Sequence, residues 1–531
     1  MRIQYKYAVG LTAAIGLFMA VLDNTIVNVA LTAMQKAFNT DVNTIQWVVT
    51  GYFLSQAAVI PVSGYFGNRL GLKRMFMLAL TLFTFGSVLC GISPNLGGPL
   101  GGESLLIIFR VLQGIGGGML FPLATSLSFG AFPPAERAAA SGLIAIPVFI
   151  APAFGPTFGG LLTDSHFGWP SIFFINVPIG ILALILVARV VRPDSETNPS
   201  LGPGPAARQA GFDWVGLVLS MVGIVCVVYA FTLVSQTASG TITAANPRGT
   251  INGWGYWPVW ALVALGLAIL AVFAYYELRV AEDPVLDLRL FSSFSFTVST
   301  TMTWVVRGVI FGSFFLIPLF LQQFRGLSAV QAGLYLMPQG IFAGISIAIG
   351  SRIYDRIGPR VLVTMGMLLL TASSAMLVFT DETSDWRFFV PLLAIRGVGF
   401  GWSNLPLQTV ALSSITGRAL PKASSLYNAT AQIFSSIGVA VLSTLFIQGT
   451  GDRVADSLRA AQGAGLRPPA DLAIRAGVGA FNHVFLIVAI ATALAILLGL
   501  LLPNKSLKQE QVASEKAGEV AHDGARFAPA E

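Results

Sequence analysis

The sequence predicts an all-α protein that crosses a lipid bilayer many times. Hydrophobic residues make up 55% of its 531 residues and charged residues only 10%, whereas about a quarter of the residues in ordinary soluble domains are charged. The mean hydropathy is +0.75. Apolar runs of about twenty residues, enough for a helix to span a bilayer, recur along the whole chain. Together these features exclude an ordinary soluble protein.

Fourteen apolar runs predict fourteen membrane-spanning helices. Their centres fall near residues 19, 55, 84, 114, 150, 180, 224, 266, 308, 340, 370, 400, 436 and 492. The first run follows Arg2 and Lys6 as a signal peptide would, but it is too long and lacks a small-residue cleavage site, which favours a retained helix. Cys90 and Cys226 both lie in apolar runs. They therefore indicate apolar packing, and neither a disulfide framework nor a metal site.

Basic residues in the polar segments predict the orientation of the chain. With the N-terminus inside, the inner segments contain twenty Lys and Arg residues and the outer segments eight, half of them in one outer loop, Gly449 to Ala476. This bias follows the positive-inside rule, so both termini are predicted to be cytoplasmic. The net charge of +7 is therefore explained by topology and does not indicate nucleic-acid binding.

Two internal repeats divide the chain. Asn68, Arg69 and Gly71 correspond to Asp355, Arg356 and Gly358 at an offset of 287, and Gly114 corresponds to Gly397 at an offset of 283. Repeats of this kind are typical of transporters. They predict an N-terminal six-helix half at 1–190, a linker with two extra helices at 191–292, and a C-terminal six-helix half at 293–503. The polar tail, 504–531, is predicted to be a disordered cytoplasmic segment.

Ionisable residues are rare inside the predicted spans. Asp23, in the stretch VLDNTIVNVA, is the only acid placed deep in a span, since Glu103, Asp164, Asp213 and Glu277 fall near span ends. A carboxylate at the centre of a membrane helix costs roughly 2.5 to 3.5 kcal/mol on insertion scales, which makes Asp23 a candidate functional residue. Three arginines lie within spans 4, 9 and 12, namely Arg110, Arg307 and Arg396.

The repeat suggests a partner for Asp23. An offset of 284 residues leads from Asp23 to Arg307, so the two charges would occupy equivalent positions and face each other across a central cavity. The alternative is that Arg307 packs against carbonyl groups or water in its own half. The residues alone leave both readings open.

Several segments resemble motifs of the major facilitator superfamily. GYFGNRLGLKR (Gly64 to Arg74) resembles its loop signature, RVLQGIGGG (Arg110 to Gly118) its fourth-helix signature, and APAFGPTFGG (Ala151 to Gly160) its fifth-helix antiporter signature. With LDNTIVNVAL, WPSIFFINVPIG, EDPVLDLRLF and fourteen spans, the chain resembles the fourteen-helix drug:proton antiporter branch. The resemblance implies a major facilitator fold, with two six-helix halves and two inserted linking helices.

The resemblance also implies residues for gating. In the family, an acid in the loop signature helps to hold the inward gate closed. Here Asn68 replaces this acid, which weakens the gate interaction in the first half. Asp355 retains the acid in the second half. Gly155 and Gly159 form a GxxxG face for close helix contact, and Pro156 bends the helix. The alternative is that the basic residues only set topology and that Gly and Pro are simply common in membrane helices. The predicted gating residues are Gly64, Asn68, Arg69, Gly71, Arg74, Gly155, Pro156, Gly159, Gly160, Asp355 and Arg356.

Arg110 matches an arginine that the family links to proton coupling. Because a guanidinium does not deprotonate in practice, Asp23 would carry the proton and Arg110 would tune it; the alternative is a structural arginine bound to helix carbonyls. Asn428 fits a family pattern whose arginine is here replaced by Ala431, so a ligand role of that helix is in doubt. Residues predicted to line the cavity, unless they serve packing or interfacial anchoring, are Asp23, Asn28, Trp47, Tyr52, Gln56, Gln113, Trp304, Arg307, Gln339, Arg396, Asn404, Gln408, Tyr427 and Asn428.

The predicted function is proton-coupled efflux of amphiphilic drugs or toxic compounds across the bacterial cytoplasmic membrane by alternating access. One deep acid among several arginines favours, as an alternative, a specific anionic or lipid-like amphiphile such as a fatty acid. A proton-coupled symporter and a membrane receptor rank lower. An enzyme is not expected, because the spans contain neither a second deep acid nor an HExxH motif.

The expected partners are a small-molecule substrate, protons and the lipid bilayer, without cofactor, metal or nucleic acid. The resemblance leaves open a periplasmic adaptor and an outer-membrane channel, for which the outer loop Gly449 to Ala476 would be the contact.

Overall fold

The computed structural model describes residues 4–40, 42–96, 101–193, 213–237, 253–416, 419–463 and 471–505. The first half contains α1 (Tyr5–Phe38), α2 (Val42–Leu70), α3 (Leu72–Ile92), η1 (Ser93–Asn95), α4 (Gly101–Ala131), η2 (Pro134–Glu136), α5 (Arg137–Thr163), α6 (Ser171–Phe174) and α7 (Asn176–Val190). The inserted segment contains α10 (Trp214–Thr237), η4 (Gly253–Gly255), α11 (Trp257–Arg279) and η5 (Leu288–Ser292). The second half contains α12 (Phe294–Arg325), α13 (Ala329–Ile357), α14 (Pro359–Leu377), α15 (Trp386–Ser413), α16 (Ala419–Gly463) and α17 (Leu472–Gly499).

The all-α prediction is confirmed. In the described residues, thirteen helical spans are long and apolar enough to cross a membrane, with α6 and α7 counted together. Helix α5 has 27 residues, which at about 1.5 Å per residue is also sufficient, so the helices agree with the fourteen predicted spans. The predicted cytoplasmic tail lies almost entirely outside the described residues.

The two halves repeat one packing scheme at the offsets seen in the sequence. Gly71 and Gly358 both adopt positive φ, +96° and +86°, a conformation that only glycine tolerates readily. A Cβ added to Gly116 would lie 2.5 Å from the backbone nitrogen of Phe83, and one added to Gly399 would lie 2.8 Å from that of Leu370. Glycine is therefore needed at both places because α4 meets α3, and α15 meets α14, backbone to backbone.

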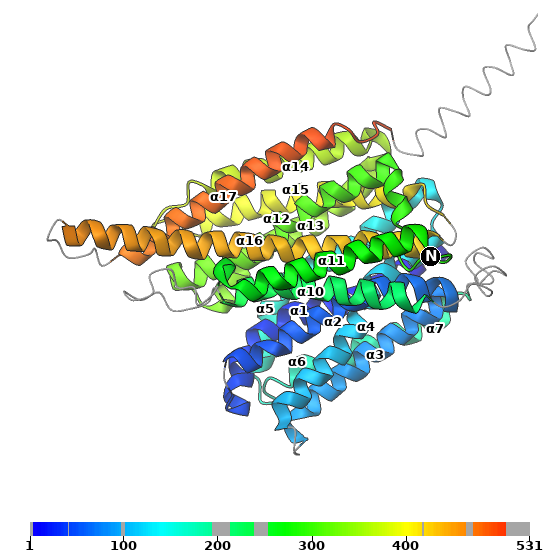
Figure 1. Cartoon of the computed structure of the whole chain (residues 1–531), viewed down its shortest axis with the longest axis horizontal. Helices are drawn as coiled ribbons and strands as arrows, with labels where there is room; N and C mark the ends of the chain where they lie inside the picture. Colours follow the sequence, from blue (N-terminus) through cyan, green and yellow to red (C-terminus); the bar gives the residue numbers. More distant parts are fainter. Residues whose placement is uncertain are drawn as a thin grey trace, which may run out of the picture.

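The inserted helices lie against the seam between the halves. In Figure 1, α10 and α11, in green, lie over the region where the first half, in blue and cyan, meets the second half, in yellow-green to red. Helix α10 packs against both α2 and α16. Ile224 and Val228 of α10 share an apolar cluster with Ala57 of α2 and Ala429 of α16. The inserted pair therefore touches both halves.

Hydrogen bonds join the halves at the end of the bundle that carries the N-terminus, here called the terminal end. The Arg137 guanidinium at the start of α5 donates to the carbonyl oxygens of Leu412, Ser413 and Ile415, which close α15. Ser141 of α5 and Thr409 of α15 share a hydrogen bond of 2.9 Å.

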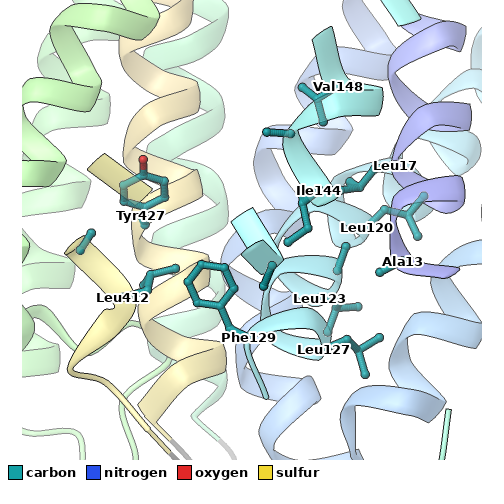
Figure 2. Packing of buried hydrophobic residues seen from close by; sticks show 14 of the residues in the cluster. Ala13, Leu17, Leu120, Leu123, Leu127, Phe129, Ile144, Val148, Leu412 and Tyr427 are labelled. Carbon is teal, nitrogen blue, oxygen red and sulfur yellow. The ribbon is translucent and has the colours of Figure 1, made fainter. Parts of the chain in front are cut away.

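Apolar packing accompanies these bonds. Phe129 of α4 belongs to the same buried cluster as Leu412, and Figure 2 shows the two side chains facing each other across the seam. The Arg137 guanidinium lies 5.5 Å from the Phe129 ring centre. The terminal end is therefore closed between α4, α5 and α15.

Helices α2 and α16 meet at the same end. Ser63 and Ser425 are hydrogen-bonded at 3.3 Å, and the Ser424 hydroxyl donates to the Pro122 carbonyl oxygen at 3.1 Å. A Cβ on Gly64 would lie 2.5 Å from the Pro421 carbonyl oxygen. Gly64, predicted to serve gating, thus lets these two helices touch.

The predicted outer loop, Gly449 to Ala476, differs from the structure. Helix α16 continues to Gly463 and α17 begins at Leu472, while 464–470 lie outside the described residues. The segment favours a helix because it is rich in Ala and Arg, which have high helix propensity, and because Arg459 pairs with Asp456 one turn earlier. Figure 1 shows α16 projecting beyond the other helices at the end opposite the N-terminus.

Candidate functional site

Asp23, the most fully buried acid among the described residues, is held by an arginine of its own half. Asp23 on α1 and Arg110 on α4 are 0% and 1% exposed. An Arg110 Nη1 hydrogen is donated to Asp23 Oδ2 at 2.6 Å, and Nε–H is donated to the Val48 carbonyl oxygen at 3.1 Å. The Tyr52 ring centre lies 3.9 Å from the guanidinium carbon. The pair is thus enclosed by α1, α2 and α4.

Two amides satisfy the second oxygen of the carboxylate. Asp23 Oδ1 accepts hydrogen bonds from Gln113 Nε2 at 3.0 Å and from Asn176 Nδ2 at 2.9 Å. Gln113 Oε1 in turn accepts from Arg110 at 2.8 Å, and Asn176 Nδ2 also donates to Ser87 Oγ at 3.1 Å. Both oxygens of this buried carboxylate are therefore satisfied, one by a guanidinium and one by two amides.

The local sequence explains why these side chains converge. Arg110 and Gln113 are three residues apart and therefore lie on the same face of α4. Ser87 lies on α3, and its hydroxyl donates to the Phe173 carbonyl oxygen at 2.9 Å in the short helix before α7. Asn176 follows directly at the start of α7. The start of α7, directly after α6, thus places the Asn176 amide beside Asp23.

The equivalent place in the second half has a different charge. The offsets of 283 and 287 relate Gln113 to Arg396 and Ser87 to Ser374. Arg396 is 0% exposed, and its guanidinium donates to Ser374 Oγ and Ser313 Oγ, both at 2.6 Å. No ion pair to Arg396 occurs in the part of the chain that the structure describes. The first half therefore holds a neutralised pair where the second holds a buried cation.

The third intramembrane arginine, Arg307 on α12, is half-buried. Its guanidinium carbon lies 5.6 Å from the Phe311 ring centre, and its Nε has no hydrogen-bond partner among the described residues. The described residues contain no hydrogen bond or ion pair between Arg307 and Asp23, whose oxygens are already occupied. Of the two candidate partners, the structure therefore joins Asp23 to Arg110.

Several predicted cavity residues contain polar atoms without protein partners among the described residues. Trp304 stacks on Phe434 of α16 with ring centres 4.5 Å apart, and Tyr427 shares a 3.0 Å hydrogen bond with Thr303 of α12. Within the described ranges, these predicted cavity residues have side-chain atoms with no hydrogen-bond partner: Tyr52, Gln56, Trp304, Arg307, Gln339, Arg396 and Asn404. Such atoms are free to bind a ligand or water.

Other predicted cavity residues are placed differently. Asn28 is exposed, and its amide donates to the Asn24 carbonyl oxygen one turn earlier. Trp47 is 41% exposed and packs against Tyr229 of α10. Asn428 donates to the Ser424 carbonyl oxygen of its own helix at 2.8 Å, while Gln408 is buried on α15. Local helix contacts explain Asn28 and Asn428 without a ligand.

A carboxylate that the sequence did not single out bridges the halves. Asp283, after α11, forms ion pairs with Arg69 of α2 at 3.2 Å and with Lys422 of α16. We call Arg69, Asp283 and Lys422 the inter-half bridge. Asn68, which stands where the family has an acid, directly precedes Arg69 in the sequence and is buried. Arg69 thus has an acidic partner from the inserted segment.

The remaining predicted gating residues occupy loop and packing positions. A Cβ on Gly155 of α5 would lie 2.0 Å from Thr25 Oγ1 of α1, and one on Gly160 would lie 3.3 Å from Val330 of α13. Gly159 is buried, and the side chain of Pro156 lies outside the described part. Arg74 and Arg356 are exposed near the terminal end, and Asp355 is half-buried.

Sequence reasoning missed several members of these networks. Asn176 was part of the motif WPSIFFINVPIG but was given no role, although an amide in an apolar span is itself a signal. Asp283 lies in EDPVLDLRLF, and only three-dimensional packing shows that it reaches α2 and α16. Lys422 was counted for topology alone.

The fold and this site define a multi-pass membrane transporter. The model of the Major Facilitator Superfamily matches residues 13–439, so the chain belongs to the major facilitator superfamily. The "Multidrug resistance protein B homolog" of Mycobacterium tuberculosis (strain ATCC 25618 / H37Rv) is 32% identical over 517 residues, covering 94% of this chain and 89% of that protein.

Two further comparisons agree with this assignment. The "Fatty acid resistance protein FarB" of Neisseria gonorrhoeae is 33% identical over 448 residues, covering 82% of this chain and 80% of that protein. The structure of the proton:xylose symporter XylE superposes with a TM-score of 0.60 at 15% identity, covering 96% of this chain and 99% of that chain. The second likeness supports the fold alone.

Proposed function

We propose that this protein exports amphiphilic small molecules across the bacterial cytoplasmic membrane in exchange for protons. The observation that carries the proposal is the buried network of Asp23, Arg110, Gln113 and Asn176, because it holds a titratable carboxylate inside the membrane. The relatives named for multidrug and fatty acid resistance support export as the direction.

The geometry gives Asp23 a way to couple protonation to movement. Asp23 connects α1 to α4 through Arg110 and to α7 through Asn176. When Asp23 takes up a proton it loses its charge, and the attraction to the guanidinium falls. A neutral carboxyl also accepts fewer hydrogen bonds. We infer that protonation loosens this helix contact and changes the preference between the two states of alternating access.

The orientation that we propose places both termini in the cytoplasm, so the closed terminal end is the inner gate. Protons then enter from outside, reach Asp23, and are released inside while substrate leaves. One proton moving down about 100 mV supplies roughly 2.3 kcal/mol. This amounts to a concentration ratio of about fortyfold per charge.

Proton release on addition of substrate tests the coupling. The purified protein is reconstituted in liposomes with a pH-sensitive dye, and substrate-dependent proton movement is compared for the parent, Asp23→Asn and Asp381→Asn. Asp381 lies in an exposed loop, where its carboxylate binds Ser384 and Thr383, so this variant controls for the loss of an acid. We expect exchange to disappear only in Asp23→Asn. Undiminished exchange in that variant would refute the role of Asp23.

The charge balance favours a narrower substrate class, an anionic or lipid-like amphiphile. Asp23 is neutralised by Arg110, whereas Arg307 and Arg396 form no ion pair in the described part of the chain. Arg307 lies on α12 one turn after Trp304, whose ring stacks on Phe434. A guanidinium beside an aromatic pair suits an anionic head with an apolar tail.

Matched amphiphiles distinguish this class. A fatty acid and a quaternary ammonium compound of equal chain length compete for efflux of one labelled substrate. We expect the anion to compete better in the parent, and this preference to fall in Arg307→Gln but not in Lys36→Gln, a basic residue that carries no cavity role. Equal competition by the cation would exclude the anionic class and leave general drug efflux.

Counterflow of a labelled amphiphile in the same liposomes separates a transporter from a receptor. A symporter would move protons and substrate in the same direction. An antiporter would move protons and substrate in opposite directions.

A further inference from the structure

A second pair of carboxyl groups is buried outside the Asp23 site. Asp213 precedes α10 and is 8% exposed, and Glu277 lies in the last turn of α11 and is 2% exposed. One oxygen of each, Asp213 Oδ2 and Glu277 Oε2, has no hydrogen-bond partner within the described residues. The transport mechanism above uses neither group. Two buried acids with unsatisfied oxygens therefore need an explanation.

The two carboxyl groups converge on one glycine. A Cβ added to Gly216 of α10 would lie 2.3 Å from Asp213 Oδ2 and 2.7 Å from Glu277 Oε1. These two oxygen atoms are therefore at most 5.0 Å apart. The absence of a side chain at Gly216 leaves room for both groups, and its backbone N–H donates to Asp213 Oδ1 at 2.8 Å.

Two like charges this close, and both buried, disfavour full ionisation. Burial penalises each charged form, and a neighbouring carboxylate penalises it further. A shared proton relieves both penalties, as it does in paired carboxyl groups generally. Lys422 on α16 is near enough to act on Glu277 electrostatically, but its ammonium group already pairs with Asp283.

The charges of the groups around the Asp213–Glu277 pair also indicate that the pair holds one proton. The groups that face the pair are Tyr276 of α11, Tyr65 and Arg69 of α2, Lys422 of α16 and Asp283 of the segment after α11. Fully ionised, three carboxylates would face two cations. One proton on the Asp213–Glu277 pair makes the group neutral.

The pair is also joined directly to the inter-half bridge. Glu277 Oε1 accepts a hydrogen bond from the Val285 N–H at 3.1 Å, two residues after Asp283. The Asp213 N–H donates to the Tyr65 hydroxyl at 3.2 Å, and Tyr65 lies one turn before Arg69. The Tyr65 ring centre is 4.9 Å from the Arg69 guanidinium carbon. The acid pair therefore contacts the bridge on two sides, at the segment that carries Asp283 and, through Tyr65, at Arg69.

We propose that Asp213 and Glu277 form a second proton-binding site, which holds one shared proton while the bridge of Arg69, Asp283 and Lys422 closes the terminal end. Loss of this proton adds a negative charge beside Asp283. The added charge repels the Asp283 carboxylate and competes for Lys422. Both effects weaken the connection between α2 and α16, so deprotonation opens the terminal end.

The direction of the pH dependence of closure follows from thermodynamic linkage between proton binding and the two states. If the closed state binds the proton more tightly than the open state, acid favours closure and alkali favours opening. For one linked proton, the ratio of closed to open molecules changes by up to about tenfold per pH unit. This dependence is separate from Asp23, which lies in α1 and does not contact the bridge.

Distances between spin labels on the two halves test the proposal. Leu70 at the end of α2 and Ile357 at the end of α13 are exposed near the terminal end and correspond at the repeat offset of 287. Labels are attached to Leu70→Cys and Ile357→Cys in a background of Cys90→Ser and Cys226→Ser that still transports. Double electron–electron resonance is then recorded in nanodiscs from acid to alkaline pH. In the parent we expect the short-distance population to fall as the pH rises.

Glu277→Gln and Asp213→Asn remove one acid each and keep the shape. Either variant is expected to retain the short distance at alkaline pH, whereas Asp287→Asn, a nearby half-buried acid, keeps the parent's pH dependence. Infrared titration adds a direct readout: a protonated-carboxyl band should be lost in Glu277→Gln and kept in Asp23→Asn. Persistence of the band, or an unchanged pH dependence of the distance in both Glu277→Gln and Asp213→Asn, would overturn the proposal. Because the Asp23 variant is measured separately, this failure is distinct from failure of proton-coupled export.

Discussion

Arg110 and Asp23 are linked by a 2.6 Å ion pair in which neither side chain reaches solvent. Breaking a buried pair by removing one partner leaves an uncompensated charge, which typically destabilises a protein by about 3–5 kcal/mol. Removing both charges is far less harmful. This asymmetry separates the structural role of the pair from its role in coupling.

Asp23→Asn is therefore expected to lower the apparent melting temperature of the detergent-solubilised protein, because Arg110 is left unpaired. The double variant Asp23→Asn/Arg110→Gln should regain most of the loss, yet neither variant should transport substrate against a gradient. Thermal unfolding and efflux from liposomes measure the two effects. Efflux by the double variant would show that the proton is carried elsewhere.

Substitution of Arg396 should affect thermal stability differently from substitution of Arg110. It forms no ion pair in the described residues, and its serine partners keep other bonds, since Ser313 donates to Val309 and Ser374 to Leu370. Arg396→Met therefore leaves no orphaned charge and is expected to leave thermal stability unchanged or raise it. Arg110→Met should lower stability by about 3–5 kcal/mol. Equal losses in both variants would mean that Arg396 has an anionic partner.

The sequence was a good guide to the fold because hydropathy and loop charge report helix number directly. The repeat offsets were equally informative, since they rest on glycines such as Gly116 and Gly399, where the backbones of two helices touch. Helix α16 was harder to predict. Its continuation beyond the apolar run has helix-forming residues but no hydropathy signal.

The site could be predicted only in part. Asp23 and Arg110 are rare charges in apolar runs, so composition alone identified them. Their pairing was open because the offset from Asp23 to Arg307 carries no information about side-chain direction. Asp283 illustrates a second limit: its partners Arg69 and Lys422 are 214 and 139 residues away in the chain, and no local pattern links them.

Asp283→Asn tests the inter-half bridge. The three side chains are only 10–18% exposed, which is between a surface pair and a fully buried one, so we expect a loss of stability of about 1–3 kcal/mol. The closed terminal end should nevertheless be less populated, because the ties to α2 and α16 both weaken. Asp287→Asn is the matched control, since among the described residues Asp287 accepts a hydrogen bond from the nearby Arg289 N–H and forms no ion pair. The spin-label distances described above measure the shift, and identical distances in the two variants would argue against a bridge.

Gly438 of α16 provides a packing test within the second half. A Cβ at this position would lie 2.1 Å from the Gly308 carbonyl oxygen and 2.4 Å from the Gly308 Cα of α12. Because both obstacles are backbone atoms, the helices themselves must separate, and Gly438→Ala is expected to destabilise the protein by about 1–3 kcal/mol. Gly255→Ala is the control, since nothing lies within 4 Å of its added Cβ. Thermal unfolding of the two variants decides the point: a melting temperature for Gly438→Ala equal to that of Gly255→Ala would show that α12 and α16 do not pack this closely.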